Sequence, residues 1–269
     1  MRLLSWNVFH GRDSPPGGRG LYTWRSRILK ITERDEEYAQ VNRPLLDEFA
    51  AWLAGHEWDV ALLQEAPPRW LRPLAARAGA GGTSALTSRN VPALPRALVA
   101  GWSPDLIKSH EGGSNQLLVR PPVRIGEVRR LTLTRKPERR RMLWARLDTQ
   151  EGPVAVANIH ASTRGAGAAD VALAAERAAA WAGSLPLVLG GDLNIRPDEE
   201  PEVFDALRER FGLAPPTAPD AIDHLLARGL EVVEPPRRLA VAERELREPG
   251  GRRIRLSDHA PVVATLRVR

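Results

Sequence analysis

Cysteine is absent from this chain of 269 residues. The protein therefore forms no disulfide and offers no thiolate, so any metal site is built from oxygen and nitrogen ligands, and a structural zinc site of the cysteine type is excluded. No stretch approaches the roughly 20 apolar residues that span a bilayer, and the amino terminus lacks the apolar segment of a signal peptide. We therefore expect no membrane span, a cytoplasmic location and, by default, a monomer.

Lysine is scarce, because only Lys30, Lys108 and Lys136 accompany the many arginines behind the net charge of +6. A basic balance favours polyanionic partners such as nucleic acid. An arginine-rich chain that is also heavy in alanine, glycine and proline can equally reflect GC-rich coding. The charge therefore leaves both a phosphate-binding surface and a purely compositional origin open.

Short apolar and β-branched segments typical of strands recur along the chain, with helical patterns between them. The strand-like segments are residues 2–8, 59–65, 115–120, 127–134, 142–149, 153–161, 185–194, 222–229 and 261–266, and the helical ones are 21–33, 42–55 and a run from 168. Loops dense in glycine and proline lie at 11–20, 76–84, 214–220 and 247–253, and none is long enough to be an interdomain linker. The pattern predicts an α+β layered sandwich in a single domain over residues 1–269.

Polar side chains stand where these strand-like segments meet their loops. Each alone has an ordinary explanation as a turn former, a helix cap or a hydrogen-bonded core residue. Repetition at the same relative position is harder to explain in that way, and it predicts a common polar edge. The residues concerned are Asn7, Gln64, Glu65, Asn158, His160, Asp192, Asn194 and Asp223 at carboxyl ends, and Asp258 and His259 at the start of the last strand.

The residue types at this edge suit phosphate chemistry. Glu65, Asp192 and Asp258 are hard oxygen ligands for Mg²⁺, Mn²⁺ or Ca²⁺. Asparagine amides can donate hydrogen bonds to phosphate oxygens or coordinate a metal through their oxygen, and a histidine beside an aspartate is a common acid or base. Metal ligands, phosphate donors and a histidine together predict hydrolysis of a phosphate ester.

The series SWNV, LLQE, NIHAS, GGDLN, IDHLL and LSDHAPV, in this order, resembles the endonuclease/exonuclease/phosphatase superfamily, the deoxyribonuclease I-like metal-dependent phosphoesterases. The resemblance extends from Asn7 to His259, and its most specific parts are GDLN and SDH. It implies a four-layer α/β/β/α sandwich, in which two packed, mostly antiparallel sheets are flanked by helices and the active site lies at one edge.

The resemblance also implies a site for Mg²⁺, with Mn²⁺ as an alternative. Glu65 would be the principal ligand, with Asn7 and Asp258 beside it. Asp192 would orient or deprotonate the attacking water, and Asn194 would hold that water or a phosphate oxygen.

The resemblance gives the histidines separate roles. His259, paired with Asp223, would contact the scissile phosphate and stabilise its developing charge. His160 would stabilise the transition state or serve the leaving oxygen. The sequence leaves open which histidine is the general acid.

The middle of the chain departs from the apurinic endonuclease branch, which resembles this sequence but usually carries a catalytic tyrosine there. The two tyrosines here, Tyr22 and Tyr38, lie early in the chain. In the matching segment HEGGSNQLLVRPPV we predict Asn115 as a substrate contact, with Glu111 as an alternative partner for His160. DNA repair is therefore not favoured.

The loop that follows Asn7 is a second candidate for substrate contact. Arg12 is predicted to bind phosphate, together with His10 and Arg19, because arginine forks fit phosphate oxygens. A solvated loop is the open alternative.

These observations predict a metal-dependent phosphodiesterase or nuclease, in which an activated water attacks the phosphate in line. Its partner is a phosphate-ester substrate, and nucleic acid is one candidate. The first alternative is a phosphomonoesterase for a small molecule or a lipid headgroup. The second is a catalytically idle binding scaffold, against which the presence of the whole polar set argues.

Overall fold

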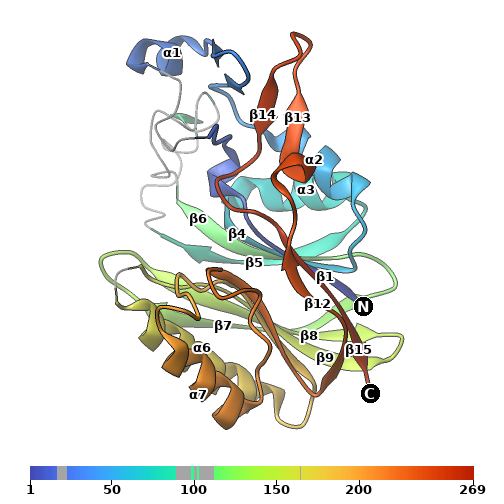
Figure 1. Cartoon of the computed structure of the whole chain (residues 1–269). Coiled ribbons are helices and arrows are strands. Elements are labelled where there is room, and N and C mark those ends of the chain that lie inside the picture. Colours follow the sequence, from blue (N-terminus) through green and yellow to red (C-terminus); the bar gives the residue numbers. More distant parts are fainter. Residues whose placement is uncertain (17–22, 89–97, 100–101, 103–111, 164) are drawn as a thin grey trace.

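Two β-sheets packed face to face form the middle of the molecule (Figure 1). The computed structural model describes residues 1–16, 23–88, 98–99, 102, 112–163 and 165–269. The six-stranded sheet has the order β12 (Leu230–Arg238), β15 (Val262–Val268), β1 (Arg2–Asn7), β4 (Val60–Ala66), β6 (Gly113–Val119) and β5 (Gly81–Thr87). The five-stranded sheet has the order β11 (Asp223–Arg228), β10 (Leu187–Asp192), β9 (Gly152–His160), β8 (Arg140–Thr149) and β7 (Arg124–Thr134).

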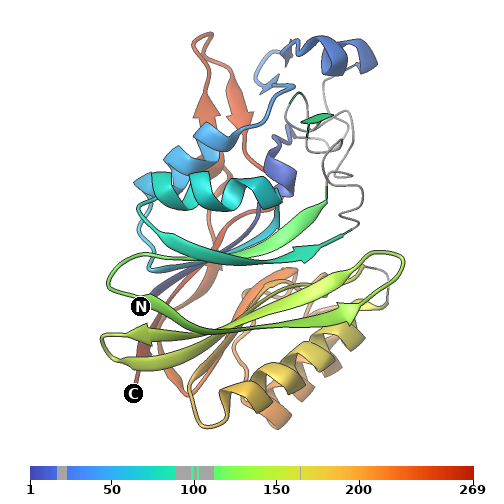
Figure 2. The same cartoon turned by 180° about the vertical axis from the view of Figure 1, so that it is seen from behind.

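Helices cover the outer face of each sheet (Figures 1 and 2). Helices α2 (Leu46–Gly55) and α3 (Leu71–Arg77) lie on the six-stranded sheet, and α6 (Gly167–Ala182) and α7 (Pro201–Phe211) lie on the five-stranded one. Three buried apolar clusters fill the spaces, one between the sheets and one under each helical layer. The predicted four-layer α+β sandwich is therefore confirmed.

Each sheet contains one parallel pair of central strands. β1 pairs in parallel with β4, and β9 with β10, whereas the other pairings are antiparallel. The connection within each pair contains a helix that covers the sheet: α6 joins β9 to β10, and α2 is the last element before β4 in the longer connection from β1. Parallel strands joined in this way place their carboxyl ends at one edge of the sheet, where their polar end residues can meet.

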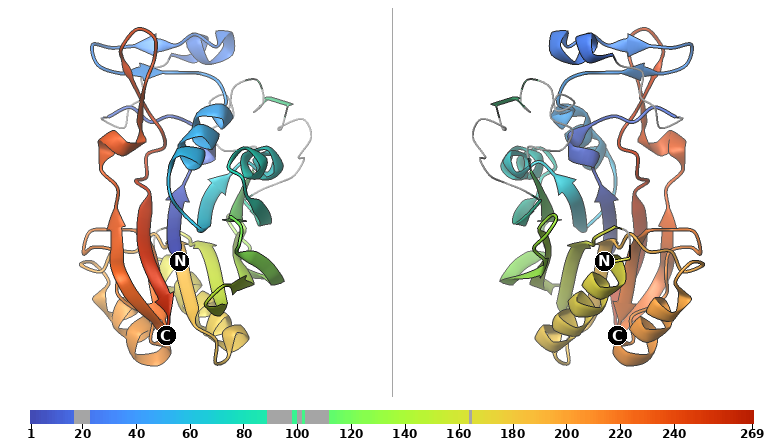
Figure 3. Two further views of the ribbon diagram at one scale, coloured as in Figure 1. Left: turned by 90° about the vertical axis from the view of Figure 1, so that its right-hand side faces the viewer. Right: turned by 90° about the vertical axis from the view of Figure 1, so that its left-hand side faces the viewer.

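Smaller elements stand beyond the sandwich (Figure 3). They are helix α1 (Trp24–Leu29) and the short strand pairs β2 (Glu33–Arg34) with β3 (Ala39–Gln40) and β13 (Glu245–Arg247) with β14 (Arg253–Arg255). No helix in the described part of the chain is both long and apolar enough to cross a bilayer.

Two predictions about elements were wrong, and some elements were not predicted. The loop predicted at 76–84 ends early, because β5 begins at Gly81. β5 is the edge strand of its sheet and its first residues are exposed, so the apolar alternation that signals a strand is missing there. Helices α3 and α7 were also missed, and Asp223 begins β11 instead of ending a strand.

A ladder of buried amides ties the two sheets together beneath the polar edge. Gln64 Nε2 in β4 donates to Asn158 Oδ1 in β9 at 2.8 Å. Asn158 Nδ2 donates in turn to the carbonyl oxygens of Leu63 at 3.1 Å and Gln116 at 2.8 Å. Gln64, Gln116 and Asn158 are fully buried. Gln64 and Asn158, which were predicted at the polar edge, therefore serve to hold the sheets in register.

We expect Asn158→Leu to lower the free energy of unfolding by about 2 to 4 kcal/mol, although leucine is similar in size. The substitution removes three hydrogen bonds in a buried region and leaves the amide of Gln64 facing a methyl group. Urea unfolding of the variant and the wild type measures the loss. A loss below about 0.5 kcal/mol, the range of ordinary surface substitutions, would show that the ladder contributes little.

Candidate active site

The carboxyl ends of the parallel strands bring the polar residues to one edge. Asn7 ends β1, His160 ends β9 and Asp192 ends β10, with His160 and Asp192 in register. Asp223 reaches the same edge from the opposite direction, because β11 runs antiparallel to β10 and pairs Asp223 with Asp192. A strand start and a strand end thus meet, which explains how Asp223 belongs to the cluster despite its position in β11.

Glu65 is turned into the site by a bulge in β4. The pairing of β4 with β6 shifts register between Leu63 and Ala66, and Glu65 has a φ of 51°. Its carboxylate lies between two imidazoles, with Oε2 3.2 Å from His10 Nε2 and Oε1 3.8 Å from His160 Nε2. Burial acts to raise the pKa of Glu65, but the neighbouring imidazoles, chiefly His10 with its hydrogen bond, outweigh it and hold that pKa well below its usual range. Glu65 is therefore ionised at neutral pH.

Asp192 is the most enclosed carboxylate of the cluster, at 1% exposure. Its Oδ2 accepts from Asn7 Nδ2 and its Oδ1 accepts from the backbone N–H of Asn194, both at 3.0 Å. Burial, and then the charge of Asp223, raise the pKa of Asp192. A carboxylate whose pKa is raised in this way is suited to accept a proton.

The glycine before Asp192 is required by close packing. Gly191 has a φ of 131°, and a Cβ there would lie 1.9 Å from the carbonyl oxygen of Ile159. The motif GGDLN therefore fixes the backbone of β10 against β9 as well as supplying Asp192 and Asn194.

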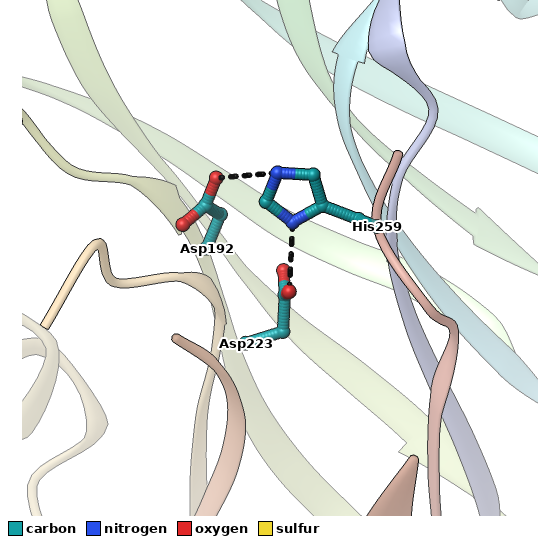
Figure 4. A group of neighbouring side chains, drawn as sticks. All are labelled: Asp192, Asp223 and His259. Carbon is teal, nitrogen blue, oxygen red and sulfur yellow. Dashed lines mark hydrogen bonds and ion pairs between the residues drawn. The ribbon is translucent and has the colours of Figure 1, made fainter. Parts of the chain in front are cut away.

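His259 forms a pair with Asp223 and points its other nitrogen at Asp192 (Figure 4). His259 Nδ1 lies 2.8 Å from Asp223 Oδ2, and Nε2 lies 3.9 Å from Asp192 Oδ2 and 4.0 Å from Asp258 Oδ1. Burial acts to lower the pKa of His259, but Asp223, Asp192 and Asp258 raise it to about 10. His259 is therefore an imidazolium at neutral pH.

The same three residues, Asp192, Asp223 and His259, also offer ligand atoms within 4.8 Å of one another. A protonated imidazole has no lone pair for a metal. We therefore interpret this group as a histidine held between two carboxylates, not as the metal centre.

His160 has the opposite environment. It is buried, and Nη1 of Arg140 lies 2.9 Å from its Nδ1 and 3.2 Å from its Nε2. Burial, and then the positive charge of Arg140, lower the pKa of His160 to about 3. His160 and His259 thus differ in charge at neutral pH, because His160 is neutral and His259 is cationic.

The segment before the last strand is anchored to β1. Ser257 Oγ donates to the carbonyl oxygen of Asn7 at 2.6 Å and accepts from the backbone N–H of His259 at 3.1 Å. The carbonyl oxygen of His259 accepts from Trp6 Nε1 at 3.0 Å. These bonds place Asp258, whose side chain is 42% exposed, and His259 over the end of β1.

A divalent cation fits the oxygen donors around Glu65. The carboxylate of Glu65 is ionised and 23% exposed. Partial burial raises the pKa of Asp258, and the nearby charge of Glu65 raises it further, although His259 acts in the opposite direction. A cation there would relieve the repulsion among these carboxylates. The Asn7 side chain is fixed beside this cluster, because its Nδ2 donates to Asp192 and its Oδ1 accepts from the backbone N–H of Phe9.

Arg12 and Asn115, which were also predicted as substrate contacts, have other contacts in the structure. Arg12 is 8% exposed, and its guanidinium stacks on the ring of Phe9 at 4.5 Å. Asn115 is fully buried in β6, and its Nδ2 donates to the carbonyl oxygen of Arg141 at 2.8 Å. Both stay predictions as substrate contacts. Arg19 and Glu111 lie outside the described residues.

Two residues in contact with the site were not assigned there from the sequence. Arg140 has no place in the predicted site, and its contact with His160 depends on the pairing of β8 with β9. His10 was named only as a substrate contact, whereas it lies against Glu65.

The fold has many relatives among solved structures. A mannosyl-6-phosphatase from Bacteroides thetaiotaomicron has a TM-score of 0.66 at 16% identity and covers 99% of each chain. The human Nocturnin catalytic domain with bound sulfate has a TM-score of 0.61 at 19% identity, covering 99% of this chain and 93% of that one. D. rerio TDP2, complexed with a single-strand DNA product, has a TM-score of 0.61 at 14% identity, covering 100% and 99%. At these identities the likeness concerns the fold.

No curated protein matches the chain by sequence. The model of the Endonuclease/Exonuclease/phosphatase family, however, matches residues 4–259, from β1 to His259. The match includes every residue of the cluster described above. The chain therefore belongs to the endonuclease/exonuclease/phosphatase family of phosphoester hydrolases.

Proposed function

We propose that the protein is a divalent-metal-dependent phosphodiesterase that acts by in-line attack of water on a monoanionic phosphate diester. The observation that carries the proposal is the pair of oppositely tuned groups around one space. Asp192 has a raised pKa and His259, 3.9 Å from it, is cationic. A base and a cation that face one another suit attack on a phosphate whose charge grows as the bond forms.

The chain's own residues take the following roles in this proposal. Asp192 accepts the proton of the attacking water, which Asn7 and Asn194 orient. His259 hydrogen-bonds a non-bridging oxygen of the phosphate, and Asp223 holds its ring in place and keeps it protonated. His160, which is neutral, hydrogen-bonds the departing oxygen. These assignments follow the family resemblance and the contacts of the cluster.

The proposed metal is Mg²⁺, with Mn²⁺ as the alternative, and its ligands are Glu65, Asn7 and Asp258. When bound, the ion supplies positive charge to the phosphate oxygens. The proposal rests on the ionised, partly exposed carboxylate of Glu65 and on the charge repulsion with Asp258.

The charge balance favours a diester over a monoester. Glu65, Asp192, Asp223 and Asp258 bring four carboxylates to the edge, against the cations His259 and Arg140. The nearby Arg196 and Arg238 are paired with Glu199 and Asp220. A monoester dianion carries about two charges at neutral pH and requires more cationic partners than a diester, which carries one. Beside His259 the surface is hollowed into a pocket of about 480 Å³, whose lining includes Arg196, Arg238 and Asp258 and which has room for the second ester group.

Parallel assays with three substrates test the proposal. We expect Mg²⁺ to support cleavage of plasmid DNA and bis-p-nitrophenyl phosphate, with turnover of p-nitrophenyl phosphate at least about tenfold lower in kcat/KM, and EDTA to remove all three activities. Glu65→Gln serves as the inactive control. Cleavage of the monoester alone would favour a phosphomonoesterase, and no turnover with either metal would favour a binding scaffold.

A further inference from the structure

The turn after β1 has a backbone that is unusual for its residues. Phe9, His10 and Gly11 have φ values of 47°, 53° and 74°. Only glycine adopts such values without cost, and an aromatic side chain there costs on the order of 1 kcal/mol. Gly11 cannot carry a side chain, because a Cβ would lie 2.0 Å from the ring of Trp70. The packing of Trp70 therefore locks a turn in which His10 is held under strain.

The strain at His10 places its imidazole against a second strained residue. His10 is 5% exposed, and its Nε2 lies 3.2 Å from Oε2 of Glu65, whose own φ is 51°. Strained residues persist where the surrounding structure determines them, and they gather at functional sites. Here both unfavourable backbone conformations serve to bring one nitrogen and one carboxylate oxygen together.

The ring of His10 lacks the bonding expected of a purely structural histidine. Its Nδ1 is buried and has no hydrogen-bond partner among the described residues. A buried histidine that only supports its neighbours usually has both ring nitrogens bonded. In His10 the only nitrogen with a described polar partner is Nε2, which faces the proposed metal ligand Glu65.

We propose that His10 Nε2 is a ligand of the divalent cation held by Glu65, an inference that rests on the proposed function. Two neighbouring ligands with bonds of about 2.1 Å lie roughly 3 Å apart, and the 3.2 Å between Nε2 and Oε2 matches that spacing. Mg²⁺ prefers oxygen ligands, whereas first-row transition ions bind imidazole more strongly. His10 therefore gives the site a preference for Mn²⁺ over Mg²⁺.

Pulsed electron paramagnetic resonance of the Mn²⁺-loaded protein tests this inference without any measurement of activity. In the wild type we expect coupling between Mn²⁺ and a ¹⁴N nucleus of histidine. His10→Asn removes the imidazole and retains a residue that tolerates positive φ, so the coupling of His10 should be lost in this variant. Mn²⁺ affinity should fall by about tenfold or more and Mg²⁺ affinity by less than about threefold.

Further variants separate the possible outcomes. His56→Asn, at a half-buried histidine stacked on Trp52, is the matched control and should leave the coupling unchanged. His10→Gln keeps a donor for Glu65 and repeats the test if His10→Asn fails to fold. Glu65→Gln should abolish Mn²⁺ binding altogether.

Two results would overturn the inference. A wild-type complex without ¹⁴N coupling, or one whose coupling survives both His10 variants, means that His10 only holds Glu65 by a hydrogen bond. If Glu65→Gln still abolishes Mn²⁺ binding in that case, the proposed function stands and the role of His10 alone is wrong. Failure of the wild type to bind Mn²⁺ would overturn both.

Discussion

Asp192→Asn is expected to reduce kcat for a phosphodiester by on the order of a thousandfold, while the protein remains folded. Asparagine keeps the shape of the side chain and can still accept from the backbone N–H of Asn194, but it cannot accept a proton from water. Single-turnover hydrolysis of bis-p-nitrophenyl phosphate with Mg²⁺ or Mn²⁺ measures the loss. Turnover within about threefold of the wild type would mean that another group is the base.

The same substitution should change how stability depends on pH. In the metal-free fold, burial and Asp223 raise the pKa of Asp192 above its unfolded value of about 3.9. Between the unfolded and the folded pKa, the folded wild type therefore binds more protons than the unfolded chain. Wild-type stability therefore falls as the pH rises through the window. Asp192→Asn does not share this fall, so its stability relative to the wild type should rise between about pH 4 and pH 8.

Thermal unfolding in EDTA measures this dependence. We expect the Tm of Asp192→Asn minus that of the wild type to increase by about 2 °C or more from pH 5 to pH 8, which corresponds to about 1 kcal/mol or more. The bond from Asn7 Nδ2 is lost in the variant, which lowers its Tm by a constant amount at every pH. Asp205→Asn, at an exposed carboxylate of α7 paired with Arg208, should show no such trend. A difference that falls with pH would falsify the raised pKa.

The strand-end residues could be predicted because a local pattern fixes their position. A segment that is apolar up to its last residues and then polar, as in β10 before Asp192, places the polar group at a sheet edge whatever the partner strand is. Parallel pairing then brings such ends together. The family resemblance added what the pattern lacked, namely the roles of Asp223 and His259.

Contacts between distant segments could not be predicted in this way. Arg140 meets His160 because β8 and β9 are neighbours, and no feature of the run ERRR distinguishes the arginine that points into the site from those beside it. Gln64 and Asn158 were grouped with the site residues, although their side chains are used between the sheets. Residue type and position could not separate these two uses, because both place an amide near a strand end.

Backbone strain was also hidden from the sequence. The described part of the chain has seven non-glycine residues with positive φ, and five of them, Phe9, His10, Glu65, Asn194 and Ser257, lie in the site or in the turns that hold it. Such conformations cost about 1 kcal/mol or more each and are retained where a side chain must be aimed. The strain therefore marks the same edge that the polar residues mark, by an independent physical criterion.

Asp223→Asn is expected to lower kcat and to change the shape of its pH dependence. In the wild type Asp223 accepts from His259 Nδ1 at 2.8 Å and is the leading group that raises the pKa of His259 to about 10. The imidazolium therefore persists through neutral pH and is lost only as the pH rises through that value. Without the carboxylate, the pKa should fall toward its ordinary value of about 6.5, although Asp192 and Asp258 still oppose the fall.

The loss of charge should appear on the alkaline side. We expect kcat to fall by about 10- to 100-fold at pH 8 and by less at pH 6, where the imidazole of the variant is still protonated. Profiles of kcat from about pH 5.5 to 9.5, with ¹⁵N chemical shifts of His259 followed over the same range, test the assignment. Asp220→Asn removes a nearby carboxylate that pairs with Arg238 and does not contact His259, so its profile should remain parallel to that of the wild type.

A parallel profile for Asp223→Asn itself would mean that Asp223 only positions the ring. In that case the ¹⁵N shifts would still report a cationic His259 at pH 8, because Asp192 and Asp258 would keep the ring protonated. The two measurements thus separate a carboxylate that maintains charge from one that maintains geometry. The 2.8 Å bond from Nδ1, against 3.9 Å and 4.0 Å from Nε2 to the other carboxylates, favours the first.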